Sequence, residues 1–478
     1  MSKKKIKNNI KIHFCGKNSD SVTGSMIYIQ SFNKKILLEC GLFQSNNIKE
    51  DYKINSKKFM FKADELDYVF INHSHADHSC LVPRLVKEGF DGKIITTTPT
   101  AKILEVMFYD SAHILESDAI RLSKMNGIPF NPIYTNSDVE KTLDIMYEYE
   151  YGEIHKLDEF ISFKFLHNCH IFGATQLELY IKDELGVQKT ILYTSDLGNM
   201  SFKNYYTEDT EYCKKANIAI CEATYGNSER SINKKDRELD LQKIKSAIDT
   251  VCLFRGGRLL IPSFSLHRTP TIMSIIYDLF HNDDMFDIPV IVDSPLSNKL
   301  LEVYGDTLSG EDKGEFDKMM SWKNFKFVTD YTDSKVWQLD KKPKVVISSS
   351  GNLLAGRSIC YTKEFLPHTD DMILFIGFSP MNSLATKIKQ GKTQKTITIE
   401  GKPYKNRCDI MDLKSFSSHI QQNEMIDYYS SIDCESIYLV HGEMDSKLEL
   451  KLLLEKELSK KNKTTRVIAT NKDMVCNL

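Results

Sequence analysis

The segment Asn72-His73-Ser74-His75-Ala76-Asp77-His78 concentrates potential metal ligands in one short stretch. It follows residues 66–72 (LDYVFIN), an apolar run bounded by turn residues that predicts a buried strand. Side chains two residues apart on an extended chain point to the same side, so His73, His75 and Asp77 can converge. Imidazole and carboxylate groups suit zinc, and a cluster this dense suits two ions better than one. The stretch therefore predicts a metal site at the end of a strand rather than a polar surface turn.

The surrounding chain predicts a mixture of strands and helices. Short strands with tight turns are expected near the start, at residues 11–14, 25–31 and 35–40. Apolar residues that recur every three or four positions predict a long helix over 101–124. After about residue 205, strand candidates at 218–221, 258–261, 289–292 and 345–348 alternate with helical stretches. That alternation favours βαβ units and a parallel sheet.

Composition narrows the class of protein. Of 478 residues, 41% are hydrophobic and 27% charged, which is typical of a globular chain and excludes a disordered one. No apolar run approaches the roughly 20 residues that span a bilayer, and no apolar segment follows the basic start, so we expect neither membrane insertion nor secretion. Eleven cysteines without a Cys-x-x-Cys pair argue against a disulfide framework. These features together predict a cytoplasmic protein.

The net charge of −2 offers no general attraction to nucleic acid. If the substrate is a polyanion, positive potential must be local or supplied by bound metal.

The histidine-rich segment resembles the His-x-His-x-Asp-His motif of the metallo-β-lactamase superfamily, and further motifs of that superfamily follow in order. Residues 168–173 (NCHIFG) resemble the segment that supplies a third histidine, here His170. Residues 193–199 (YTSDLGN) resemble the strand end whose aspartate, here Asp196, bridges the metals. Residues 37–44 (LLECGLFQ) resemble the early strand that ends in an acidic residue, here Glu39.

The second half of the chain resembles the β-CASP ribonucleases, of the short bacterial or archaeal type related to the cleavage subunit of pre-mRNA 3′-end processing. The motifs that carry this resemblance are CEATYG (221–226), GRLLIPSF (257–264), VDSP (292–295), SSSG (348–351), KSFSSH (414–419) and LVHGE (439–443). The resemblance implies an α/β fold, a metallo-β-lactamase αββα sandwich with an inserted α/β β-CASP domain. Its expected parts are residues 1–205, the β-CASP domain at 206–385, and a return segment at 386–478.

The resemblance also implies a site with two zinc ions and a hydroxide held between them. One ion would take His73, His75 and His170. The other would take Asp77, which is also counted as catalytic, with His78 and His441. Asp196 would bridge the two ions. Outside the metal shell, His419 would position the phosphate or protonate the leaving oxygen, and Glu222 would orient His419.

Phosphate contacts are expected in the second half of the chain. The candidates offer hydroxyls, backbone N–H groups and guanidinium groups, all suited to phosphate, and are Ser348, Ser350, Gly351, Arg357 and Arg268. The alternative is a Ser- and Gly-rich turn with a structural arginine.

Several positions depart from the usual motifs. Glu39 stands where aspartate is usual, Cys80 and Ser195 replace glycines, and His267 occupies a position that is usually small. The segment after Arg357 lacks the histidines often found there. None of these departures removes a metal ligand.

The leading hypothesis is therefore a zinc-dependent ribonuclease acting on single-stranded RNA, with an endonuclease favoured over an exonuclease and a homodimer left open. One alternative is a DNA-processing nuclease, which His441 argues against, since DNA-specific relatives carry another residue there. A small-molecule hydrolase is disfavoured by the β-CASP-like insertion, and a di-iron redox enzyme by His75, where a glutamate would be expected. A non-catalytic scaffold subunit of an RNA-processing complex is disfavoured because no ligand is lost.

Overall fold

The computed structural model describes residues 10–45, 47–183, 186–201, 204–229, 232–377, 379, 383–391 and 395–478. The basic start of the chain, residues 1–9, lies outside these ranges. The chain forms two compact units, one made of Met1–Ser231 with Ser418–Leu478 and the other of Ile232–Ser417. Within the described ranges, no helix is both long enough and apolar enough to cross a membrane.

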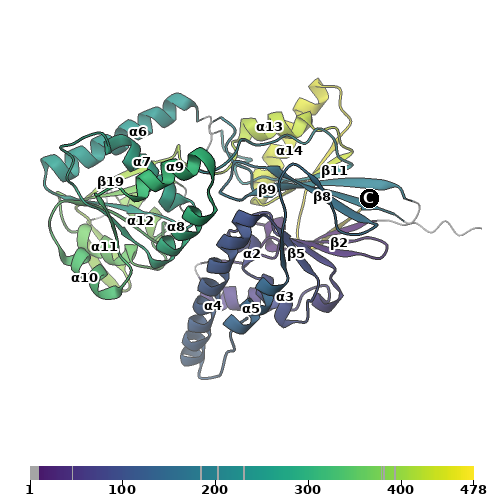
Figure 1. Ribbon diagram of the computed structural model, residues 1–478, viewed down its shortest axis with the longest axis horizontal. Helices are drawn as coiled ribbons and strands as arrows, with labels where there is room; N and C mark the ends of the chain where they lie inside the picture. The colour runs from purple at the N-terminus through teal and green to yellow at the C-terminus, as the bar shows by residue number, and fades with distance from the viewer. Residues whose placement is uncertain are drawn as a thin grey trace, which may run out of the picture. The chain divides into compact units, whose positions relative to one another are not determined.

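Two seven-stranded sheets make up the first unit, and their strands are seen in Figure 1. The first sheet has the order β22-β1-β2-β3-β4-β5-β6 and the second β21-β20-β11-β10-β9-β8-β7. The bounds in the first sheet are β1 (Lys11–Phe14), β2 (Ile27–Gln30), β3 (Lys35–Leu38), β4 (Tyr68–Phe70), β5 (Lys93–Thr96), β6 (Met146–Glu148) and β22 (Met474–Asn477). Those in the second are β7 (Ile154–Lys156), β8 (Ile161–His167), β9 (Thr175–Lys182), β10 (Gln188–Tyr193), β11 (Ile218–Glu222), β20 (Ser436–Val440) and β21 (Arg466–Ala469).

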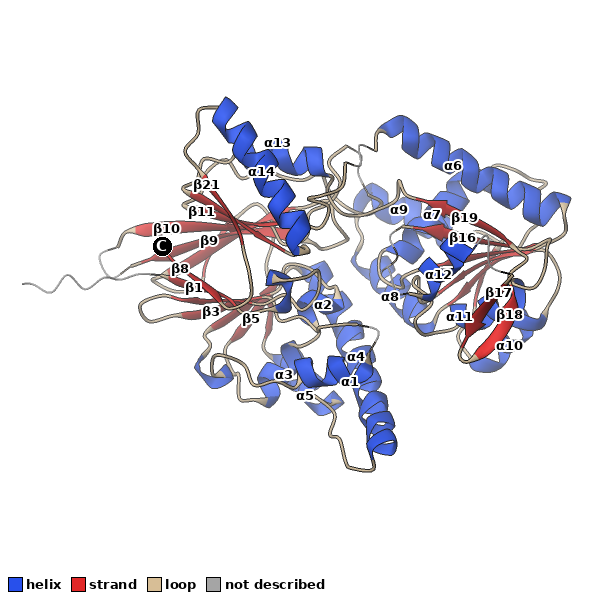
Figure 2. Cartoon of the chain, turned by 180° about the vertical axis from the view of Figure 1, so that it is seen from behind, coloured by secondary structure: helices blue, strands red, loops and turns tan. Residues whose placement is uncertain are grey.

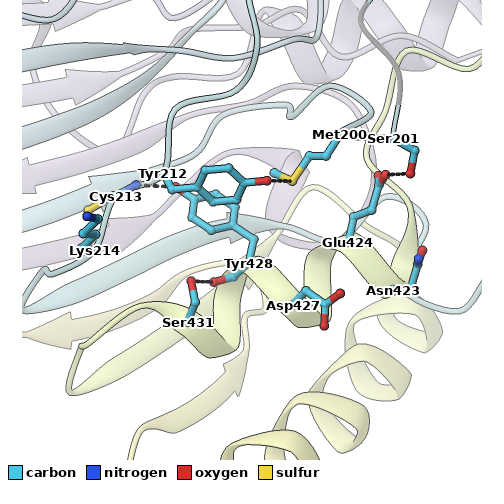
Figure 3. Close-up of a pocket in the computed structure, with 10 residues that line it drawn as sticks. All are labelled: Met200, Ser201, Tyr212, Cys213, Lys214, Asn423, Glu424, Asp427, Tyr428 and Ser431. Carbon is cyan, nitrogen blue, oxygen red and sulfur yellow. Dashed lines mark hydrogen bonds between the residues drawn. The ribbon is translucent and has the colours of Figure 1, made fainter.

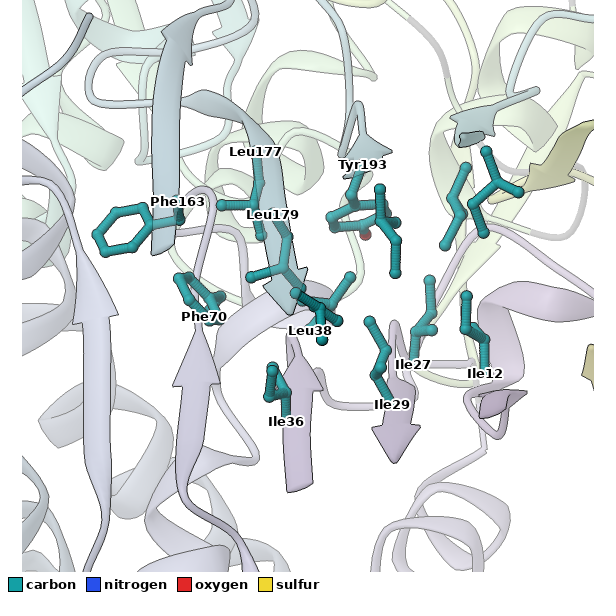
Figure 4. Close-up of a cluster of buried hydrophobic side chains, with 14 of the residues drawn as sticks. Ile12, Ile27, Ile29, Ile36, Leu38, Phe70, Phe163, Leu177, Leu179 and Tyr193 are labelled. Carbon is teal, nitrogen blue, oxygen red and sulfur yellow. The ribbon is translucent and has the colours of Figure 1, made fainter. Parts of the chain in front are cut away.

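The main core of this unit lies between the two sheets (Figure 4). In β8 the residues Ile161, Phe163 and Phe165 alternate with less buried neighbours, so one face of the strand points into the core. Phe163 meets Phe70 of the other sheet edge-on, with ring centroids 5.1 Å apart. Burying one such aromatic side chain contributes roughly 1.5–3 kcal/mol, so the facing sheets stabilise each other.

Helices cover the outer faces of both sheets (Figure 2). On the first sheet they are α1 (Ile48–Asn55), α2 (Ala76–Ser79), α3 (Val82–Lys87), α4 (Thr98–Asn126) and α5 (Asn136–Asp144). On the second they are α13 (Gln422–Ser431) and α14 (Met444–Lys460). The layers are therefore helix, sheet, sheet and helix, which confirms the expected αββα sandwich.

The predicted long helix is present as α4 and extends slightly beyond the expected 101–124. It begins after Thr97, whose hydroxyl accepts a hydrogen bond from Thr100 N–H, and it ends at Gly127. Gly127 has φ of 68°, a conformation that glycine adopts without strain and that closes a helix.

The second unit contains a parallel six-stranded sheet in the order β14-β13-β15-β12-β16-β19. Its strands are β12 (Arg258–Pro262), β13 (Val290–Asp293), β14 (Phe325–Phe327), β15 (Lys344–Ser348), β16 (Met372–Ile376) and β19 (Asp409–Leu413), and a separate hairpin joins β17 (Thr396–Ile399) to β18 (Lys402–Lys405). Its helices are α6 (Lys234–Ile248), α7 (Arg268–Phe280), α8 (Pro295–Thr307), α9 (Gly310–Met320), α10 (Tyr331–Leu339), α11 (Ser358–Phe365) and α12 (Leu384–Gln390). The expected βαβ alternation is confirmed here.

The two units divide at points other than the predicted domain boundaries, which lie after residues 205 and 385. The strand expected at 218–221, β11, pairs in parallel with β10 and β20 and so belongs to the first unit. The strand β19 pairs with β16 and so belongs to the second unit. Hydrogen bonding between strands far apart in sequence decides both placements.

Candidate metal centre

Most of the predicted ligands, together with Glu39 and Glu222, follow the carboxyl ends of parallel strands in the first unit. Glu39 follows β3, and the segment His73–His78 follows β4. In the second sheet, Asp196 comes shortly after β10, Glu222 ends β11, and His441 directly follows β20. Because β3 and β4 are parallel, as are β10, β11 and β20, the residues after each set meet at one edge of the sheet.

A close backbone approach brings Asp196 toward His170. Gly198 packs so tightly against the loop between β8 and β9 that an added Cβ would lie 1.8 Å from the carbonyl carbon of Cys169. Asn168 joins the same two loops, because its side-chain amide donates to the Asp196 carbonyl (2.7 Å) and its oxygen accepts from His170 N–H (2.9 Å). A residue larger than glycine at 198 would separate the two ligands.

The described residues include four groups of side chains that could each hold a metal ion. Two of these groups, Glu39 with His73 and His78, and Asp196 with Glu222 and His419, overlap the remaining two, which contain only predicted ligands. The first group is His73, His75, His170 and Asp196, and the second is Asp77, His78 and His441; within each group the ligand atoms lie within 4.8 Å of one another. Asp196 is central, with Oδ2 3.3 Å from His78 Nε2 and 3.7 Å from His170 Nε2. The structure thus brings together all seven predicted ligands.

The donor set fits a cation. The Nε2 atom of His73 is buried and has no hydrogen-bond partner among the described residues. An unsatisfied buried polar atom costs free energy, and coordination to an ion would remove that cost. His170 donates through Nδ1 to the Ser418 carbonyl at 3.2 Å, which leaves its Nε2 lone pair facing the same group. These nitrogens are therefore prepared as ligands.

Burial governs the charge of the ligands. It lowers the pKa of His75 to about 3 and that of His170 well below the usual value, so both rings are neutral. His78 differs: burial lowers its pKa, but the nearby carboxylates, Asp196 and then Glu39, raise it well above the usual value. The site therefore carries neutral imidazoles at His75 and His170 and a protonated His78 held by buried carboxylates, and a divalent cation that binds there would replace the proton of His78.

His419 lies beside the first ligand group, with its ring centroid 4.6 Å from that of His170. Its Nδ1 is 3.3 Å from Glu222 Oε1. Backbone N–H groups of Leu197 and Thr224 also donate to the Glu222 carboxylate, at 2.6 and 3.3 Å. Glu222 is thereby fixed in a position from which it can orient the His419 ring.

The phosphate-binding candidates all lie in the second unit. Arg268 and Gly351 line one small cleft together with Phe264, at the carboxyl edge of the parallel sheet. Ser348 is buried and donates to the Asp293 carbonyl (2.8 Å), and Ser350 donates to the Ala355 carbonyl (3.1 Å).

Arg357 has partners within the protein. Its guanidinium donates to the Asp293 carboxylate (2.5 Å) and to the Thr329 carbonyl (3.1 Å). These bonds hold the Arg357 side chain beside the carboxyl ends of the strands. They use some of the N–H groups that could otherwise bind phosphate.

Two contributors escaped the sequence reasoning. Thr224 Oγ1 lies 3.0 Å from His441 Nδ1, and the Tyr193 hydroxyl donates to Glu39 at 2.5 Å. Thr224 lies within the segment 221–226 and Tyr193 within 193–199, but threonine and tyrosine are common in strands and turns. Their identity alone gives no signal of a role beside a metal ligand.

An open groove of about 580 Å³ lies along α13, apart from the predicted ligands (Figure 3). Exposed Tyr212 packs edge-on against Tyr428, with centroids 4.9 Å apart, and Ser201 donates to Glu424 at 2.5 Å. None of the predicted site residues lines this groove.

Two family models match parts of the chain that the sequence analysis assigned to the β-CASP domain and to the return segment. A Beta-Casp domain model matches residues 269–388. A model described as a Zn-dependent metallo-hydrolase RNA specificity domain matches residues 403–465. A crystal structure of a protein of unknown function from Enterococcus faecalis V583 has a TM-score of 0.55 and 12% identity, and the match covers 98% of this chain and 100% of that one. At this identity the likeness concerns the fold alone.

Curated relatives match over most of the chain. Ribonuclease TTHA0252 of Thermus thermophilus is 28% identical over 443 residues, covering 91% of this chain and 93% of the relative. Probable RNase MJ4 of Methanocaldococcus jannaschii is 28% identical over 425 residues, covering 88% and 90%. Endoribonuclease YSH1 of Candida albicans is 24% identical over 453 residues, covering 93% of this chain and 50% of the relative.

Proposed function

The chain belongs to the β-CASP family of metallo-β-lactamase-fold hydrolases, and we propose that it is a zinc-dependent ribonuclease that hydrolyses RNA phosphodiester bonds. The observation that carries the proposal is that six predicted ligands lie around the seventh, Asp196, and that His419, which is not a predicted ligand, lies beside them. Binding alone would not need such a histidine, whereas hydrolysis needs a group that can give or hold a proton.

We assign two zinc ions to the site. His73, His75 and His170 would hold one ion, and Asp77, His78 and His441 the other, with Asp196 shared. When bound, zinc would lower the pKa of a water molecule and neutralise the negative charge of phosphate oxygens. The short distances from Asp196 Oδ2 to ligands of both groups support the sharing.

His419 would act on the phosphate or on the leaving oxygen. Burial lowers its pKa, but the Glu222 carboxylate raises it, with a net rise to about 9. The ring is therefore protonated at neutral pH and can donate a proton or a hydrogen bond. Because Glu222 accepts at Nδ1, we assign the contact with substrate to the opposite nitrogen, Nε2.

RNA is the proposed substrate because the named relatives are ribonucleases and the return segment matches an RNA specificity domain. Single-stranded RNA is favoured, since a strand must reach a buried centre. His441 supports RNA over DNA. We also propose that the phosphates are contacted by Arg268, Ser350, Gly351 and Arg357. Ser348, also a candidate, is fully buried and donates to the Asp293 carbonyl, so its role is to support the strand end rather than to touch phosphate. A cytoplasmic location away from membranes and a homodimer are further parts of the proposal.

The test is the product pattern from a 5′-labelled single-stranded RNA incubated with purified protein and zinc. Interior cuts that disappear in Asp196→Ala but persist in Asp91→Ala, an exposed aspartate outside the site, are expected. Released mononucleotides would indicate an exonuclease. RNA that is bound but uncut by wild-type protein loaded with zinc would contradict the proposal and favour a scaffold.

A further inference from the structure

Glu39 is a fully buried carboxylate that accepts three side-chain hydrogen bonds. His78 donates from Nδ1 (2.5 Å) and the Tyr193 hydroxyl donates to the same oxygen, Oε2, at 2.5 Å. Ser195 donates from its hydroxyl to the other oxygen, Oε1, at 2.6 Å. The longer side chain of glutamate thus lies between residues of both sheets.

Ser195 connects Glu39 to a second histidine. The His73 Nδ1 atom is 3.8 Å from Glu39 Oε1, too far for a hydrogen bond, but only 3.1 Å from the Ser195 hydroxyl oxygen. A carboxylate only accepts, so Ser195 commits its single proton to Glu39 and can only accept from His73. His73 must therefore carry its proton on Nδ1, which leaves Nε2 unprotonated.

The direction of this chain of hydrogen bonds matters for the metal centre. His73 Nε2 is the buried atom that lacks a hydrogen-bond partner among the described residues, and it belongs to the first group of ligands. His78 belongs to the second group. One carboxylate therefore orients a histidine from each group, directly in one case and through Ser195 in the other.

We propose that Ser195 is a positioning residue that couples Glu39 to His73 and so sets the affinity of the metal position formed by His73, His75 and His170. This inference rests on the proposed function, since it assumes that the two groups bind zinc. It also accounts for two departures from the family motifs together, because Glu39 and Ser195 act as one unit. Aspartate and glycine, which are usual at these positions, lack the reach and the hydroxyl.

Backbone conformation supports a functional reason for this serine. Ser195 has φ of 51°, a region that glycine adopts freely and other residues adopt at a cost of order 1–3 kcal/mol. A serine persists there although glycine would remove the strain. The two hydrogen bonds of its hydroxyl, to Glu39 and from His73, are the contacts that glycine would lose.

The experiment is a zinc-competition titration against a chromophoric chelator, with the metal alone and no substrate. Ser195→Gly should bind one of its two zinc equivalents about 10–100-fold more weakly than wild type, the usual effect of losing a residue that orients a ligand. The other equivalent should be unchanged. Glu39→Gln should weaken both equivalents, because Glu39 contacts a histidine of each group.

The matched control is Ser74→Ala, which removes a buried hydroxyl from the ligand segment itself. That hydroxyl has no hydrogen-bond partner among the described residues, so both equivalents should bind as in wild type. Ser195→Ala, which keeps Cβ, should repeat the glycine result and exclude an effect of backbone freedom. In a His441→Ala background, Ser195→Gly should still weaken the zinc that remains.

Unchanged affinity in Ser195→Gly, or equal weakening of both equivalents, would overturn the inference. Failure of the proposed function is distinguishable: wild-type protein would then bind no zinc or leave RNA uncut. Wild-type protein that binds two zinc ions and cuts RNA, with Ser195→Gly unchanged, would contradict the inference alone.

Discussion

Glu222 Oε1 lies 3.3 Å from His419 Nδ1, although the two residues are 197 positions apart in the chain. Glu222 ends β11, and His419 precedes α13, which packs on the same sheet. The pairing places a negative charge behind the His419 ring and favours its protonated form. His419 thereby differs from the ligands His75 and His170, whose rings are neutral and can accept a cation.

The first prediction concerns His419→Ala. Because His419 belongs to neither ligand group, the variant should retain its zinc while turnover falls by roughly 10²–10⁴-fold, the usual range for removing a general acid or base. Steady-state cleavage of labelled RNA and elemental analysis of the same preparation check both parts. Glu222→Gln should show a milder loss. If His419→Ala released zinc, His419 would be a ligand; if it were fully active, the proposed role would be wrong.

A second prediction follows from the raised pKa of His419, about 9. The folded-state pKa lies above the ordinary value of 6.5, so the protonated form is populated below pH 9 and lost as pH rises through it. The plot of kcat/KM against pH should therefore fall on the alkaline side near pH 9. In Glu222→Gln this fall should move to lower pH, because the carboxylate charge that favours protonation is gone. An identical alkaline limb in both proteins would contradict the assignment.

The third prediction is metal content. Wild-type protein should approach two zinc equivalents after dialysis, measured by elemental analysis, because Asp196 belongs to the first ligand group and lies 3.3 Å from His78 of the second. Asp196→Ala should fall clearly below wild type, and His441→Ala should lose zinc as well as activity. Zinc near zero in the wild-type protein would contradict the catalytic proposal.

The fourth prediction concerns the substrate. Single-stranded RNA should be cut faster than single-stranded DNA of the same sequence, and binding should weaken as salt rises, because the net charge of −2 leaves affinity to local neutralisation of phosphates. Parallel time courses on the two labelled strands measure the preference. Equal rates would overturn the RNA assignment and leave a nuclease of broader specificity.

The fifth prediction tests the backbone contact behind the ligands. Gly198→Ala would place a Cβ 1.8 Å from the Cys169 carbonyl carbon, so the loops of Asp196 and His170 must separate. We expect a loss of about 3 kcal/mol or more in the free energy of unfolding, together with weaker zinc binding.

Gly314→Ala is the matched control for Gly198→Ala. A Cβ at this exposed position in α9 meets nothing within 4 Å, and alanine is the better helix former. A gain of about 0.5–1 kcal/mol is expected, with zinc binding unchanged. Denaturant unfolding of the two variants gives the comparison. Equal stability of Gly198→Ala and wild type would contradict the close approach.

The sequence determined whatever depends on neighbours along the chain. Strands and helices are set by local periodicity, and α4, from Thr98 to Asn126, contains the whole of the helix expected over 101–124. The ligands His73 to His78 could be predicted because they lie in one short segment after a strand. The expected extended chain does not continue to Asp77, because Asp77 and His78 belong to helix α2. Ligands elsewhere, such as His170 and His441, could be predicted only through resemblance to family motifs.

Tertiary structure alone decided the contacts between distant segments. The bond from Ser195 to Glu39 joins residues 156 positions apart and depends on two sheets that face each other. The placement of β11 in the first unit likewise depends on which strands supply its hydrogen bonds. Local spacing specifies which way a side chain points from its own backbone. The distant group that this side chain then contacts depends on how the sheets pack to bury the core, which is a property of the whole fold.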